Sequence, residues 1–108
     1  MVTEISLNTI CGHNTKVTAV KEGKHTHVHI DTDCEKLKKW GTDFDLEAKD
    51  LMGGQETVLT KKTEKAPLTP TCFVPATVMN ACWLENGMIS KRLASDKGKI
   101  EIVFDKLE

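Results

Sequence analysis

The sequence predicts an α+β fold, a two-layer sandwich in which a small antiparallel sheet carries two or three helices on one face. Three strand-like segments follow one another at the N-terminus, helical segments fill the middle of the chain, and one more strand-like segment lies near the C-terminus. Short turns between the first strands favour antiparallel pairing, and helices grouped after them favour one covered face. The length of 108 residues suits a single α+β domain, residues 1–108.

The first two segments alternate between apolar and polar side chains in the way half-buried strands do. Residues 2–10 place Ile5 and Leu7 on one face and polar side chains on the other. Residues 15–21 are rich in β-branched side chains, which favour strands. Gly12 lies in the break between them and permits a backbone conformation that other residues resist. We therefore expect a tight connection between the first two strands.

Residues 25–31 form the third predicted strand, after a short turn at residues 22–24. The period of two places Val28 and Ile30 on one face. The opposite face carries His25, His27 and His29. Three imidazoles on one strand face can bind a divalent metal, including Ni or Zn added in vitro, but an exposed polar face is the interpretation that we favour.

A helix is predicted to begin near Cys34 and to run through Trp40. Thr32 or Asp33 supplies a side chain that can cap its first turn. Gly41 is the expected stop, because glycine readily adopts the left-handed conformation that ends helices.

The rest of the chain holds further helices and a last strand. Residues 44–52 predict one or two helical turns, and residues 55–65 predict a weaker helix for which a strand remains an alternative. The strongest helix prediction begins near Pro75 and ends before Gly87, and residues 90–97 have the polar composition of a loop. The final predicted strand joins the three N-terminal strands in the sheet; it spans residues 98–104, with Ile100, Ile102 and Phe104 facing inward.

Composition excludes several classes of partner. The net charge of −1 gives no basic field for nucleic acid or an anionic membrane, and the chain has no Tyr for base stacking. The N-terminal residues lack a basic region and a long apolar run, so we expect neither a signal peptide nor a membrane span. The expected location is cytoplasmic, the expected state is a monomer or homodimer, and the remaining partner class is another protein.

Three of the four cysteines stand where one element gives way to the next. They are Cys11, Cys34 and Cys72. The last two precede predicted helices, whose N-terminal backbone N–H groups favour a thiolate. Soft thiolates suit Zn or an iron–sulfur cluster, and His13 is a candidate fourth ligand in a Cys₃His set. The sequence thus predicts a metal site made of Cys11, Cys34, Cys72 and His13.

Other interpretations of the cysteines stay open. All three can be small core side chains of a metal-free protein–protein interaction module, and Cys82 lies on the apolar stripe of the last main helix. A thiol enzyme with Cys72 as nucleophile is a weaker hypothesis, because no partner base is identifiable. The sequence also lacks the common hydrolase, zincin and nucleotide-binding motifs, so a non-enzymatic role is favoured.

The order of the cysteine segments resembles that of the NifU/IscU-type iron–sulfur scaffold proteins. The matching segments are Cys11-Gly12-His13, Asp33-Cys34 and Pro70-Thr71-Cys72 with the helix that follows. The chain also looks like a small uncharacterised prokaryotic family with Cys-Gly, Asp-Cys and Cys-x-Val-Pro segments. The resemblance covers roughly residues 10–85 in pattern, and the sequence departs from the scaffold pattern at His13, Asp33 and Thr71. It implies a scaffold-like or carrier-like metal or iron–sulfur binding protein.

Overall fold

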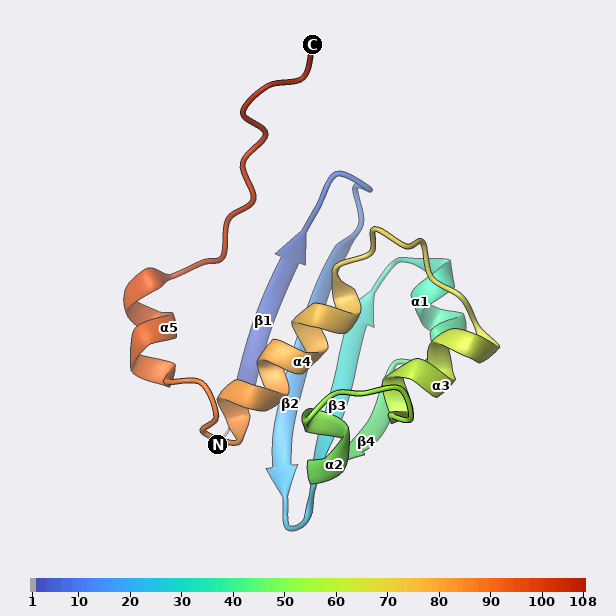
Figure 1. Cartoon of the computed structure of the whole chain (residues 1–108), viewed down its shortest axis with the longest axis vertical. Coiled ribbons are helices and arrows are strands. Elements are labelled where there is room, and N and C mark those ends of the chain that lie inside the picture. The colour runs from blue at the N-terminus through green and yellow to red at the C-terminus, as the bar shows by residue number, and fades with distance from the viewer. Residues whose placement is uncertain (1) are drawn as a thin grey trace.

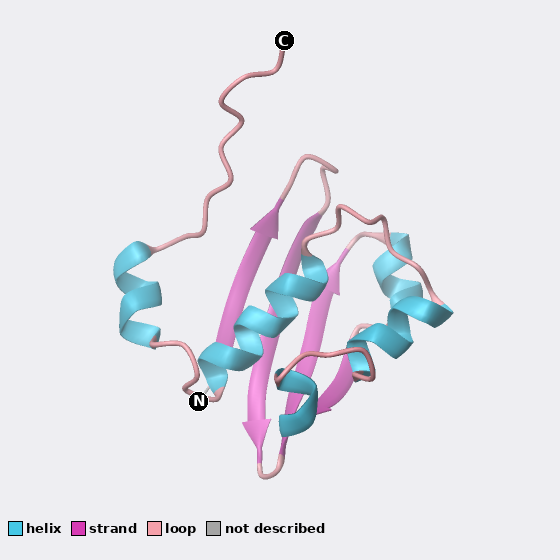
Figure 2. Cartoon of the chain, viewed as in Figure 1, coloured by secondary structure: helices cyan, strands magenta, loops and turns pink. Residues whose placement is uncertain are grey.

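Four strands form one antiparallel sheet in the order β1-β2-β3-β4. The computed structural model describes residues 2–108. The strands are β1 (Thr3–Asn8), β2 (Asn14–Glu22), β3 (His25–Thr32) and β4 (Asp43–Glu47). The helices that pack on this sheet lie on one of its faces, so the predicted α+β class is confirmed (Figure 2).

Within residues 2–108, five helices lie between or after the strands (Figure 1). They are α1 (Glu35–Trp40), α2 (Ala48–Leu51), α3 (Val58–Lys65), α4 (Val74–Glu85) and α5 (Lys91–Lys97). The longest of them, α4, lies across β1 and β2, while α1 and α3 lie side by side toward the other edge of the sheet (Figure 1). Within residues 2–108, no helix is long and apolar enough to cross a membrane.

The helix ends follow from local sequence. Gly41 ends α1 with a φ of 114°, as its position predicted. Thr57 caps α3 and exchanges hydrogen bonds with Thr60, so the helical alternative for residues 55–65 is confirmed over most of that segment. Pro75 lies in the first turn of α4, where its missing N–H leaves no helical bond unmade.

The core lies between the sheet and the helices. Strands alternate, so every second side chain points to this core, while the helices contribute their sheet-facing residues. Its fully covered members include Val17, Ala19, Val28, Ile30, Leu46, Val78, Ala81 and Cys82. The predicted inward orientation of Val28 and Ile30 is confirmed, and so is the core position of Cys82.

The fourth strand is β4, and not the C-terminal segment that the sequence predicted. Asp43–Glu47 alternates strictly, with Leu46 fully buried, and it pairs with β3 from His25 to His29. The predicted helix over residues 44–52 is therefore wrong for its first half, and α2 supplies its second half. This segment forms a strand because the edge of β3 is available for pairing. Pairing with β3 satisfies backbone N–H and C=O groups that would lack hydrogen bonds in an isolated two-turn helix.

The strand prediction for residues 98–104 is wrong for this structure. These residues form no strand, and Ile100, Ile102 and Phe104 are all exposed. The chain instead leaves the body after α5 as a tail that projects away from the sheet (Figure 1). Residues 90–97, predicted as a loop, hold α5, which begins where the Ser90 hydroxyl accepts a bond from the backbone N–H of Leu93.

Candidate functional site

The three boundary cysteines lie at one end of the sheet. Cys11 lies in the turn that joins β1 to β2, Cys34 directly precedes α1, and Cys72 lies two residues before α4. The turn and the start of α1 are tied together, since Nδ1 of His13 lies 2.8 Å from a carboxylate oxygen of Asp33. Figure 1 shows the β1–β2 turn and the first turns of α1 and α4 at the same end of the molecule.

The same-end arrangement does not amount to an assembled ligand set. Tetrahedral Zn–S bonds of about 2.3 Å would hold the sulfurs about 3.8 Å apart. Within residues 2–108, the ligand atoms of Cys11, Cys34, Cys72 and His13 do not all lie within 4.8 Å of one another. Cys11 is exposed, whereas Cys34 and Cys72 are half-buried against the core. Metal binding by this set would require at least one of the segments that carry these residues to move.

Two of the cysteines have opposite electrostatic settings. A hydrogen bond with the Thr9 hydroxyl, 3.1 Å from the sulfur, and another from the backbone at His13 lower the pKa of Cys11. Burial raises the pKa of Cys82 to about 12, and the nearby Glu85 carboxylate adds to this. Cys11 is therefore the more acidic of the two thiols and lies on an exposed turn, while Cys82 is a neutral core side chain.

The two thiols should react with alkylating agents at different rates. At neutral pH, we expect iodoacetamide to modify Cys11 at least about tenfold faster than Cys82, because the thiolate is the nucleophile and Cys82 is both covered and protonated. Mass spectrometry of peptides over a time course measures both rates. Equal rates in the native protein would contradict this placement, and equalisation in urea is the control.

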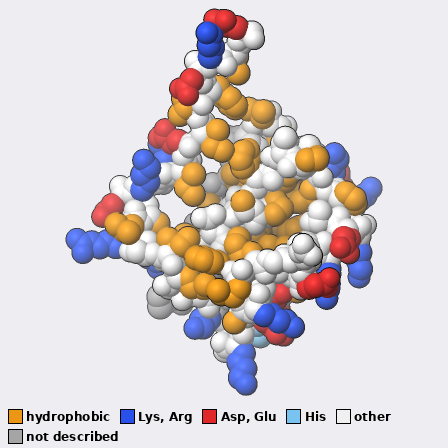
Figure 3. Space-filling view, viewed as in Figure 1, with side chains coloured by type: hydrophobic (Ala, Val, Ile, Leu, Met, Phe, Trp, Pro, Cys, Tyr) orange, Lys and Arg blue, Asp and Glu red, His pale blue; other side chains and the backbone are white. Residues whose placement is uncertain are grey.

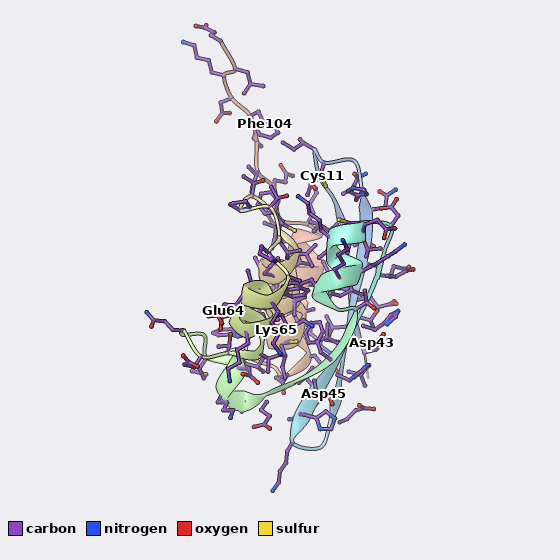
Figure 4. The ribbon with its side chains drawn as sticks, turned by 90° about the vertical axis from the view of Figure 1, so that its right-hand side faces the viewer. Cys11, Asp43, Asp45, Glu64, Lys65 and Phe104 are labelled. Carbon is purple, nitrogen blue, oxygen red and sulfur yellow. The ribbon has the colours of Figure 1, made fainter. Side chains whose placement is uncertain are left out.

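A second group of chemistry-bearing side chains lies on the open face of the sheet, opposite the helices. We call it the histidine–carboxylate face. It comprises Glu22, His25, His27, His29, Asp43 and Asp45. Strand register builds it, because His27 pairs with Asp45 and His29 pairs with Asp43 between β3 and β4. Figure 4 shows Asp43 and Asp45 on the side of the sheet away from the helices. The predicted outward direction of the three histidines is confirmed.

The members of this face are in direct contact. Nδ1 of His27 lies 2.8 Å from a carboxylate oxygen of Asp45, and Nε2 of the same ring lies 3.3 Å from Asp43. The same Asp43 oxygen lies 2.8 Å from Nδ1 of His29. His25 lies 3.6 Å from Glu22 and 3.8 Å from Asp45. The imidazoles of β3 are thus flanked by carboxylates from β2 and β4.

Charge reinforces these contacts. The hydrogen bond with Asp45 raises the pKa of His27 above its ordinary value, and Asp43 adds to the effect. In turn, the hydrogen bond with His29 lowers the pKa of Asp43, with a further contribution from His27. The carboxylates thus stabilise the charged form of His27, the imidazoles stabilise the charged form of Asp43, and the pairs cross-link β3 to β4.

Three members of the face meet the first requirement of a metal site. One ligand atom each from Glu22, His27 and Asp45 lies within 4.8 Å of the other two. Imidazole nitrogen and carboxylate oxygen are ligands that Zn²⁺ and other first-row divalent ions accept. The three residues lie on three adjacent strands, β2, β3 and β4, of a hydrogen-bonded sheet. Their backbones are therefore held in place before any ion binds.

Sequence reasoning found the histidines of this face but missed their carboxylate partners. The helix predicted over residues 44–52 begins directly after Asp43 and includes Asp45, and it would have turned these two side chains in different directions. The signal was present in the strict alternation of Asp43–Glu47, in which acids flank Phe44 and Leu46. Five alternating residues with a histidine strand upstream were enough to predict a pairing of opposite charges.

The fold and the site define a small α+β protein with a four-stranded antiparallel sheet, covered by helices on one face and bearing histidines and acids on the other. The chain belongs to the family described as "Family of unknown function (DUF6951)", which matches residues 3–97. No curated protein and no solved structure matches the chain. The family match makes no link to the NifU/IscU-type scaffolds, so that resemblance stays a prediction.

Proposed function

We propose that this chain is a divalent-metal-binding protein whose ion binds on the histidine–carboxylate face, between Glu22, His27 and Asp45. The observation that carries the proposal is the convergence of three ligand atoms within 4.8 Å. The role is binding and not catalysis. The metal-binding class is the one that the cysteines suggested, but the location is different.

The chemistry of the donors selects the ion. One imidazole and two carboxylates form a mixed nitrogen and oxygen set, which suits Zn²⁺, Ni²⁺, Co²⁺ or Mn²⁺ better than a soft ion that prefers thiolates. The exposed fraction of the His27 side chain is 38%, so an ion can reach the site from solvent and keep water in its remaining positions. Such an open site fits reversible binding.

Asp43 and His29 support this site from the side. Asp43 contacts His27 at its Nε2, the nitrogen farther from the Asp45 contact, and is itself held by His29. A carboxylate that contacts one ring nitrogen fixes the orientation of the imidazole and makes the other nitrogen a stronger metal ligand. The pairs that cross-link β3 to β4 therefore also orient the central imidazole.

The cysteine end is the second candidate. It would bind Zn or an iron–sulfur cluster through Cys11, Cys34, Cys72 and His13, in keeping with the resemblance to the iron–sulfur scaffolds. The observations that favour it are the shared end of the sheet and the lowered pKa of Cys11. It ranks second because its ligand atoms are not within a common 4.8 Å. A metal-free interaction module is the remaining alternative.

Calorimetric titration with Zn²⁺ and Ni²⁺ separates these candidates. We expect the wild type to bind one ion with a dissociation constant in the micromolar range or below. Loss of a direct ligand in His27→Ala should weaken binding by about 100-fold, because removal of even a supporting residue costs 10- to 100-fold in metal affinity. Thermal unfolding gives a second readout, since bound metal raises the melting temperature of the wild type and not of the variant.

Two matched variants complete the experiment. His13→Ala removes a half-buried histidine at the far end of the sheet and should leave Zn²⁺ binding unchanged, while Cys34→Ser tests the cysteine end. Binding that survives His27→Ala but is lost in Cys34→Ser would transfer the function to the cysteines. Millimolar binding alone, or none, would remove the metal proposal for this face.

A further inference from the structure

β1 is an edge strand with a free outer side. Within residues 2–108 it pairs with β2 and has no strand on its other side. An edge strand presents unpaired backbone N–H and C=O groups, which can accept another strand. Its core-facing side chains Ile5 and Leu7 are half-buried, in contrast to the fully covered Val17 and Ala19 of β2. The apolar layer is therefore incomplete at this edge.

The same chain carries a strand-like segment that has no partner. Residues 98–104 alternate in the manner of a half-buried strand, yet the exposed fractions of Ile100, Ile102 and Phe104 are 82%, 63% and 59%. Hydrophobic side chains follow the projecting tail in the space-filling view, and Phe104 lies on it well beyond the helices (Figures 3 and 4). Exposed apolar side chains in this pattern indicate a segment that becomes buried in a complex.

The tail's direction indicates whose β1 it pairs with. All strand pairs of the sheet are antiparallel. In Figure 1 the tail leaves α5 and runs toward the end of the sheet at which β1 ends, so it heads the same way as its own β1. Antiparallel pairing with that strand would require the tail to reverse, whereas a second copy can present its β1 in the opposite direction.

We propose that residues 98–104 of one copy add to the β1 edge of a second copy as an antiparallel fifth strand, and that two copies exchange tails around a two-fold axis. Placing Ile102 opposite Ile5 puts Ile100, Ile102 and Phe104 on the helix-covered face, because strand side chains alternate. The resulting core-facing pairs are Ile100 with Leu7, Ile102 with Ile5 and Phe104 with Thr3. The exchange is independent of the proposed metal site.

Two features allow this exchange. The ion pair between Lys91 and Glu85 holds the start of α5, but α5 buries none of its side chains, so the rest of the helix can adjust as the tail pairs. Gly98, with a φ of 82°, separates α5 from the tail and permits a sharp change of direction there. A reciprocal arrangement pairs the β1 edge of each copy with the tail of the other copy. No tail is left unpaired, which closes the assembly at two copies.

Sedimentation across a concentration series tests the exchange in the full chain. We expect a dimer that dissociates on dilution, and a monomer at all concentrations when residues 98–108 are deleted. Ile102→Lys should raise the dimer dissociation constant about 100-fold or more, because both copies lose the burial of an apolar side chain. Leu107→Lys, which makes the same change at an exposed tail position outside the strand, is the control and should leave it unchanged.

Hydrogen exchange identifies the occupant. Protection of the amides of residues 98–104 should rise with protein concentration in step with the dimer. Protection that does not depend on concentration would mean that the tail pairs within its own chain, and a dimer that survives the deletion would mean that another surface joins the copies. Either result, or a wild type that stays monomeric with an unprotected tail, overturns the proposal.

Discussion

Replacing Trp40 by Ala is expected to lower the free energy of unfolding by about 3–5 kcal/mol, the range for deleting a large buried aromatic side chain. Trp40 is 3% exposed and ends α1. Its ring packs edge-on against Phe44 of β4 with centroids 5.6 Å apart, and its Nε1–H donates a 3.1 Å hydrogen bond to Thr63 of α3. The side chain thus joins three elements at one point.

Lys62 adds to the cost of this substitution. Its ammonium lies 4.9 Å from the centre of the Trp40 ring and 4.2 Å from that of Phe44, and burial lowers its pKa. Without the indole, this half-buried cation loses one of the two rings that stabilise it. A loss of 3–5 kcal/mol is a large share of the stability of a chain of this size.

Urea unfolding followed by far-UV circular dichroism measures the effect without relying on tryptophan fluorescence. Trp40→Phe keeps an aromatic ring but removes the Nε1–H donor, so it should cost less than Trp40→Ala. Leu93→Ala truncates an exposed apolar side chain of α5 and is the matched control, expected within about 0.5 kcal/mol of the wild type. A loss below about 1 kcal/mol for Trp40→Ala would contradict the placement of the indole in the core.

Replacing Glu85 by Gln is expected to lower the free energy of unfolding by about 1.5–3 kcal/mol at neutral pH, the worth of hydrogen bonds to a charged group. The Glu85 side chain is 2% exposed and accepts three hydrogen bonds. The donors are the Thr3 hydroxyl at 2.8 Å, the Lys21 backbone N–H at 3.0 Å and the Lys91 ammonium at 3.3 Å. The carboxylate therefore ties the end of α4 to β1, β2 and the start of α5.

The same contacts set a pH dependence. Burial acts to raise the pKa of Glu85, but the bonds from Lys21, Thr3 and Lys91 outweigh it, and the pKa is lowered from its ordinary value of 4.5. A carboxyl whose pKa is lower in the folded state stabilises the fold fully above the unfolded-state value. That contribution is lost as pH falls through the folded-state pKa.

The stability gap between wild type and Glu85→Gln should therefore be constant above about pH 5.5 and shrink at lower pH. Urea unfolding at a series of pH values measures it. Glu64→Gln, at an exposed position of α3, is the matched control and should show a small gap at every pH. A gap for Glu85→Gln that does not change with pH would show that the carboxylate is not bonded as described.

Much of the fold followed from local pattern. The three N-terminal strands, the outward direction of His27, the stop at Gly41 and the helix after Pro75 all rest on periodicity and on residues with special backbone preferences. The core position of Cys82 followed in the same way from its place on an apolar stripe. Such features depend on a few neighbouring residues, so one sequence is enough to predict them.

Two errors have a common cause. Residues 44–47 were predicted as helix and lie in β4, while residues 98–104 were predicted as a strand of the sheet and lie outside it. Both segments alternate between apolar and polar side chains. Such a local pattern does not determine which of two candidate strands pairs with a given edge of the sheet. The β3 edge went to the segment that follows it closely in the chain, which costs less loop entropy than a strand that returns from residue 98.

The sequence by itself determined the α+β class, the faces of its strands and the positions of the reactive residues at element boundaries. Only the tertiary structure decided which of those residues meet. It paired Asp45 with His27 through the register of β4 on β3, and it placed Cys11 on an exposed turn while Cys34 and Cys72 are half-buried. The physical reason is that side-chain direction is a local property of a strand or helix, whereas the distance between two ligands depends on how separate elements pack.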